Sequence, residues 1–135
     1  MNSWKEPKNT STHHWTNHVK AKMRHYGLSE QKIRNVIKRP ERTEEGIAEN
    51  TVAVMQPQSK RRNKETGEKE WSAEIWVMYQ LGAKQEVDLD VPEALRGIFK
   101  GKRKIKVISA WRYPAVTDPG EGLPEEILRE INEAL

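Results

Sequence analysis

The spacing of the apolar residues changes at Pro40, and this change constrains the fold more than any other feature of the chain. Before it, Ile33, Val36 and Ile37 recur at the i, i+3, i+4 spacing of one helix face. After it, residues 71–80 alternate with a period of two, as in a strand with one buried side. The sequence therefore predicts helices first and strands afterwards, an order typical of an α+β domain with an antiparallel sheet.

Two helices joined by a tight turn are predicted ahead of the strands. Thr12 or Thr16 can cap the first helix, and Gly27 suits the left-handed position after its last residue. Ser29 is the expected N-cap of the second helix, which Pro40 ends.

Strands and a final helix are predicted over the rest of the chain, at 43–56 (one or two strands), 70–81, 104–113 and 123–135 (the helix), with a turn at 63–69. The predicted fold class is α+β: an N-terminal helical hairpin packed on an antiparallel sheet of about four strands, plus a C-terminal helix. Residues 1–11 are expected to be a disordered tail, and residues 12–135 a single domain whose helical extension is 123–135.

Strict alternation also predicts which strand residues share a face. In the last strand, Ile105, Val107, Ser109 and Trp111 are expected on one side of the sheet. Trp76 is expected on the other face of its strand from Ile75 and Val77. We therefore expect it to be exposed or to pack beneath the C-terminal helix.

Composition excludes several classes of protein. The chain has no cysteine, which excludes a disulfide framework, a thiolate metal site and a cysteine nucleophile. No apolar run is long enough to span a membrane, and residues 1–14 lack the apolar core of a signal peptide. We therefore expect a cytoplasmic protein without contact to a membrane.

Basic residues gather in blocks although the formal net charge is only +4. Separated basic blocks indicate a polyanionic partner, with nucleic acid as the first candidate, whereas the plainer alternative is a set of solvated surfaces. The residues expected to contact nucleic acid are Lys100, Lys102, Arg103, Lys104, Lys106, Arg61, Arg62 and Arg39.

All four histidines lie within residues 13–25, and on a helix His14, His18, Lys22 and His25 would form one stripe. His14 and His18 have the i, i+4 spacing of a chelating pair, but His25 lies two turns further on and no Asp or Glu lies on the stripe, so no metal is expected. The stripe is interpreted as the polar shoulder of a packed helix, with a catalytic role as the alternative.

Two segments resemble small uncharacterised bacterial domains allied to the RelE/BrnT toxin-like ribonucleases. In "HVKAKMRHYGLS", His18 is followed by Lys22–Met23 and then by 26–28, where the family has His, Arg-Met and Arg-Gly-Ile. "IKVISAWR" is similar to the last core strand of that family, which aligns Ser109, Ala110 and Arg112. The resemblance covers residues 16–40 and 104–113, and lysine and tyrosine stand in place of two expected arginines.

This resemblance implies a metal-independent domain that binds or cleaves RNA, without a cofactor, and that acts as the toxin of a toxin–antitoxin pair. Its expected partners are RNA and an antitoxin protein. The candidate catalytic residues are Arg112 and Tyr113 at the end of the last strand, and His18 and Lys22 on the first helix. The alternative is a non-enzymatic module of the same fold that binds nucleic acid or protein. The sequence makes no prediction of oligomeric state.

Overall fold

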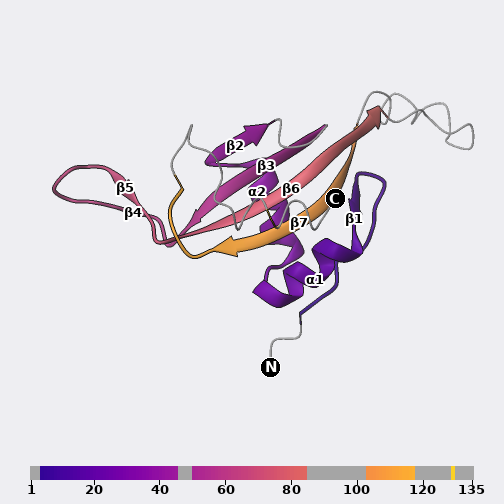
Figure 1. Cartoon of the computed structure of the whole chain (residues 1–135), viewed down its shortest axis with the longest axis horizontal. Coiled ribbons are helices and arrows are strands. Elements are labelled where there is room, and N and C mark those ends of the chain that lie inside the picture. Colours follow the sequence, from indigo (N-terminus) through magenta and orange to yellow (C-terminus); the bar gives the residue numbers. More distant parts are fainter. Residues whose placement is uncertain (1–3, 46–49, 85–102, 118–128, 130–135) are drawn as a thin grey trace, which may run out of the picture.

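A five-stranded sheet with two helices packed against it forms the main body of the chain in a computed structural model (Figure 1). The structure describes residues 4–45, 50–84, 103–117 and 129. Its elements are β1 (His13–Trp15), α1 (Asn17–Tyr26), α2 (Glu30–Lys38), β2 (Arg42–Glu45), β3 (Thr51–Gln58), β4 (Arg61–Arg62), β5 (Lys69–Glu70), β6 (Ala73–Lys84) and β7 (Arg103–Tyr113).

The helical hairpin begins and ends as its capping residues predict. The Thr16 hydroxyl accepts a hydrogen bond from the Val19 amide at 3.1 Å, and Gly27 ends α1 with a φ of 69°. The Ser29 hydroxyl accepts from the Lys32 amide and starts α2. Thr16 is therefore the cap of the first helix, and the alternative at Thr12 is wrong.

The predicted fold class is wrong in its sheet, which is mixed rather than antiparallel and has five strands rather than about four. The strand order is β1-β7-β6-β3-β2, and β1 pairs parallel with β7 while the other neighbours are antiparallel. The extended backbone of Thr16 keeps His13–Trp15 out of the helix, and these residues add to the edge of β7. The C-terminal helix predicted at 123–135 lies, except for Arg129, outside the described residues.

A β-bulge in β7 overturns the predicted division of that strand into faces. Met78 pairs with Ser109 and Tyr79 with Val107, so Ile108 is an extra residue in the ladder. The extra residue reverses the alternation of faces in the rest of the strand. As a result, Val107 packs against the helices, whereas Trp111 packs on the opposite side of the sheet.

Both sides of the sheet are buried. The helix-side core is one apolar cluster, made of Trp15, Val19, Met23, Leu28, Ile33, Val36, Val54, Ile75, Val77, Val107 and Ala110. The far-side core is a second cluster, made of Ala53, Met55, Trp76, Met78, Ile108 and Trp111. Trp76 has no exposed surface, which excludes the exposed alternative predicted for it.

The N-terminal segment, predicted as a disordered tail, contacts the helical hairpin at Leu28 and strand β1 at Trp15. The Trp4 indole Nε1 donates to the Leu28 carbonyl at 3.0 Å, and the Asn9 side chain accepts from the Trp15 amide at 2.8 Å. Within the described parts of the chain, no helix combines the length and the apolar character that crossing a bilayer requires.

The short strands β4 and β5 form a separate hairpin that projects from the end of the sheet where β6 begins (Figure 1). Its turn lies within the predicted residues 63–69. The Asn63 side chain accepts from the amides of Glu65 and Thr66, and Gly67 adopts a φ of 74°.

Candidate nucleic-acid interface

The end of β7 places the two main catalytic candidates on opposite faces of the sheet. Arg112 pairs in register with Ile75, which belongs to the helix-side core, and its side chain is exposed. Tyr113 pairs with Glu74 and packs on the far-side core. Because adjacent residues of a strand point to opposite faces, β7 does not direct this arginine and this tyrosine toward one phosphate.

The predicted histidine stripe is divided between two elements. His14 belongs to β1, whereas His18, Lys22 and His25 belong to α1, so His14 and His18 do not have the i, i+4 geometry of one helix. His18 and Lys22 are half-buried and lie one turn apart on α1.

Burial lowers the pKa of His13 below 6.5, and the positive charge of Arg34 lowers it further, whereas Glu30 opposes the change. The Nδ1 atom of His13 lies 2.9 Å from the Thr12 hydroxyl. The uncharged imidazole is therefore the form that the fold favours at the sheet edge.

The predicted nucleic-acid contacts fall at two ends of the sheet. Lys106 is exposed and pairs with Gln80, far along β6 from the hairpin, and Lys104 beside it is half-buried. Arg61, Arg62 and Arg39 are all exposed, the first two on β4 and the third at the end of α2. Lys100, Lys102 and the side chain of Arg103 lie outside the described residues.

Three adjoining hollows of about 500, 230 and 710 Å³ run from α2 to the base of the β4–β5 hairpin. Arg39 lines both the first and the second. Glu41 lines the second, and its carboxylate lies 3.9 Å from the Nζ of Lys69, which lines the third. We call this surface the basic groove; its charged lining residues are Lys32, Arg34, Lys38, Arg39, Glu41, Lys60, Arg61, Lys69 and Glu70.

Gln56 of β3 holds the wall of the basic groove together. Its side-chain nitrogen donates to the carbonyls of Asn35 and Arg39 at 3.2 and 2.9 Å, and its oxygen accepts from the Lys32 Nζ at 3.0 Å. One side chain of the sheet thus fixes the last turn of α2, next to Lys38 and Arg39 of the groove.

Positive charge predominates in the basic groove, because seven of its nine charged lining residues are cations. Glu41 pairs with Lys60 at 3.2 Å, and Glu70 lies 3.9 Å from Arg61, whose side chain is 81% exposed. Such exposed ion pairs contribute at most about 1 kcal/mol, so an incoming phosphate can displace them.

Sequence reasoning missed most of these cations, since it singled out only Arg39 and Arg61 among them. The signal lay in the second helix: once Ile33 and Val36 face the core, Arg34 and Lys38 lie on the outward side of the helix. The approach of Lys60 and Lys69 to Glu41, which follows that helix, depends on tertiary contacts, and no local pattern indicates it.

Sequence reasoning also missed a buried carboxyl group beside the groove. Glu74 has no exposed surface, and its oxygens accept from the indole nitrogens of Trp71 and Trp76 at 2.9 and 3.1 Å. They also accept from the hydroxyl and the amide of Thr117 at 2.6 and 3.2 Å. Four donors around one group suit an ionised carboxylate, which accepts at both oxygens.

Arg42 extends this network over the far-side core. Its guanidinium lies 5.0 Å from the centroid of the Trp76 ring, donates to the Thr117 carbonyl at 2.8 Å and pairs with Glu44 at 2.9 Å. A cation and a carboxylate thus flank the same buried tryptophan.

Comparisons of this chain with protein-family models, with curated protein sequences and with solved structures find no match.

Proposed function

We propose that this chain is an RNA-binding domain and that the basic groove is its binding surface. The observation that carries the proposal is the excess of cations around three adjoining hollows, which provides a path of positive charge along the surface. Lysine and arginine side chains bind the phosphate backbone of nucleic acids in this way, independently of base sequence.

The resemblance to the RelE/BrnT toxin-like ribonucleases favours RNA as the nucleic acid. The two segments that carry this resemblance are distant in sequence but pack together. Thr16 at the start of α1 donates its hydroxyl to the Ile108 carbonyl of β7 at 3.0 Å, and its amide donates to the Val107 carbonyl at 3.2 Å. The two segments are therefore in direct contact in the fold.

Binding rather than cleavage is the activity we propose. Cleavage without a metal needs a proton acceptor, a proton donor and a cation around one phosphate. The side chains of Arg112 and Tyr113 lie on opposite faces of the sheet, so these two residues are poorly placed to act on one phosphate. The length of the RNA after incubation, read on a denaturing gel, reports cleavage separately from binding.

The test is the affinity for a short single-stranded RNA across a series of salt concentrations. Replacing Lys38, Arg39 and Lys60 together by alanine should weaken binding by roughly tenfold or more at moderate salt. The slope of log affinity against log salt should fall by about 2, since each lost contact to single-stranded RNA removes about 0.7 from it.

The matched control replaces three exposed cations that do not line the groove, Lys8, Arg24 and Lys106, by alanine, so that it loses the same number of positive charges. This variant should keep the wild-type slope. Equal losses in both variants would mean that net charge alone attracts the RNA, and no binding of wild type at low salt would refute the proposed function.

A further inference from the structure

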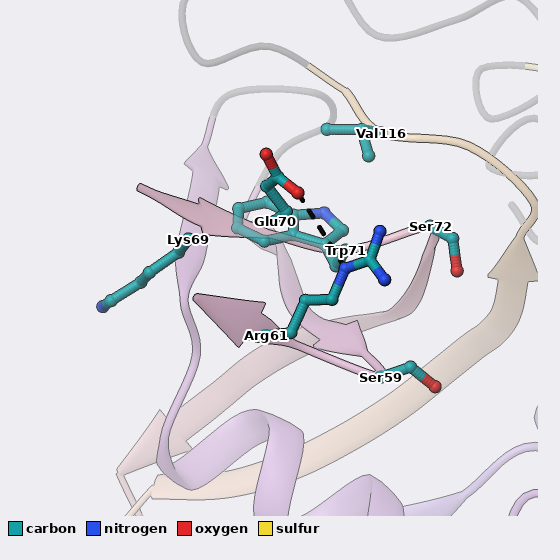
Figure 2. Close-up of a pocket in the computed structure, with 7 residues that line it drawn as sticks. All are labelled: Ser59, Arg61, Lys69, Glu70, Trp71, Ser72 and Val116. Atoms are coloured by element: carbon teal, nitrogen blue, oxygen red, sulfur yellow. Dashed lines mark ion pairs between the residues drawn. The ribbon is translucent and has the colours of Figure 1, made fainter. Parts of the chain in front are cut away.

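Trp71 lies at the junction of the β4–β5 hairpin and β6, beside the largest hollow of the groove. The 710 Å³ hollow is lined by Ser59, Arg61, Lys69, Glu70, Trp71, Ser72 and Val116. Figure 2 shows the indole ring next to the ion pair of Arg61 and Glu70, while the Lys69 side chain points outward. Trp71 is half-buried: it packs against the far-side core and also lines the hollow.

A hydrogen bond to a buried carboxylate fixes the orientation of this ring. The indole Nε1 of Trp71 donates to Glu74 at 2.9 Å, and Glu74 is held in turn by Trp76 and Thr117. A ring anchored through its polar edge loses little conformational freedom when a ligand stacks on it. Binding to an aromatic surface that is already positioned is stronger for this reason.

The chemistry of the hollow matches a nucleotide. An aromatic face offers a stacking surface to a flat base, and the exposed guanidinium of Arg61 can bind phosphate oxygens through its planar fork. The hydroxyls of Ser59 and Ser72 line the same space and can serve as donors or acceptors to a sugar. Its volume is in the usual range for sites that hold a small ligand.

We propose that this hollow receives one unpaired base of a single-stranded RNA, stacked on Trp71, with Arg61 bound to an adjoining phosphate. The inference rests on the proposed function, because the phosphate contacts of the basic groove would hold the strand beside the hollow, where Arg61 and Lys69 supply the cations. A base paired within a duplex is stacked on its neighbours and cannot occupy the site, so the proposal predicts a preference for single strands.

The first experiment changes the ligand and leaves the protein intact. Fluorescence-anisotropy titrations compare a short oligouridylate with an abasic oligonucleotide of the same length and with a duplex RNA. The oligouridylate should bind roughly 5- to 100-fold more tightly than the abasic strand, as expected for one stacked base. Equal affinity for the two would overturn the inference and leave phosphate binding by the groove in place.

The second experiment changes the ring. Trp71→Leu should remove the preference for the oligouridylate over the abasic strand, whereas Trp71→Phe, which keeps a stacking face, should retain most of it. A melting curve for each variant separates lost stacking from lost folding. Retention of the full base preference in a folded Trp71→Leu protein would overturn the inference.

Free uridine monophosphate distinguishes a strand from a mononucleotide as the natural occupant. It should bind far more weakly than the oligouridylate, because it makes no contact with the rest of the groove. Equal affinity for the two would overturn the assignment to RNA and identify a nucleotide site. Failure of every polynucleotide to bind would refute the proposed function itself.

Discussion

The two sides of the sheet are both buried, but they are built from different kinds of side chain. The helix-side core joins α1 and α2 to the sheet through aliphatic residues, methionine and Trp15. The far-side core stacks Trp76 on Trp111, with ring centroids 6.1 Å apart, and places Glu74 and Arg42 against them. Both sides depend on apolar packing, and the far side also buries a carboxylate whose two oxygens are hydrogen-bonded.

This difference connects the core to the candidate interface. Apolar packing is largely non-directional, so the helix-side core itself specifies the position of no polar atom, and directional contacts to α2 come from Gln56 outside that cluster. The Glu74 network is directional, and one of its four hydrogen bonds fixes Trp71 at the rim of the basic groove. The far side thus contributes to function as well as to stability.

The largest expected effect comes from removing the buried carboxylate. Glu74→Ala leaves the donors of Trp71, Trp76 and Thr117 without their partner, so the free energy of unfolding should fall by about 3–5 kcal/mol. Urea unfolding followed by far-ultraviolet circular dichroism measures it.

The matched control for this change is Glu70→Ala, which removes a carboxylate whose side chain is 42% exposed. It should cost less than about 1 kcal/mol. Similar midpoints for the two variants would show that the Glu74 network contributes no more than a surface carboxylate.

A smaller difference in stability is expected when the same substitution, tryptophan to phenylalanine, is made in each of the two cores. The Trp76 indole nitrogen donates to Glu74, whereas that of Trp15 is buried without a hydrogen-bond partner among the described residues. Trp76→Phe should therefore destabilise the fold by about 1–2 kcal/mol more than Trp15→Phe, since only the first change breaks a hydrogen bond to a buried carboxylate. Chemical unfolding of both variants under one set of conditions gives the difference. A larger loss at Trp15 would refute the contrast between directional and apolar packing.

The smallest effect is a dependence of stability on pH at the edge of the sheet. The pKa of His13 is lowered in the fold by burial and by the Arg34 charge, so the unfolded chain takes up a proton first as the pH falls. The stability contributed by the neutral imidazole should be complete above pH 6.5 and be lost as the pH falls through the folded pKa. His13→Gln should flatten this part of a series of urea midpoints. An unchanged pH profile in the variant would contradict the assignment.

Much of the fold follows from local patterns in the sequence. The caps at Thr16 and Ser29, the glycine at position 27 and the alternation in β6 each depend on interactions within a few residues. Such features are visible in a sequence because the physical cause and the residues that express it lie together.

The rest depends on contacts between distant residues. The parallel pairing of β1 with β7 joins residues 13–15 to 105–107, and three extended residues give no periodic signal. The bulge at Ile108 is equally hidden, and it reverses every face assignment beyond it. The resemblance to the RelE/BrnT toxin-like ribonucleases stays a prediction.

From the sequence alone, only the positive charge of the candidate site could be predicted. Basic composition pointed to nucleic acid, and Arg39 and Arg61 were among the residues expected to bind it. The approach of Lys69 to Glu41 and the anchoring of Trp71 by a buried glutamate arise from tertiary packing, which no spacing rule reproduces.

The most direct test of the account is a titration of the ¹⁵N-labelled protein with a short oligouridylate, followed through the indole N–H signals of its five tryptophans. Trp71→Phe identifies the signal of Trp71, and Trp15→Phe that of Trp15. The Trp71 signal should move with added RNA, together with the backbone amides of Arg39 and Arg61, while the Trp15 signal in the helix-side core stays in place. A stationary Trp71 signal, with shifts confined to Lys104 and Lys106 at the other end of the sheet, would contradict the account.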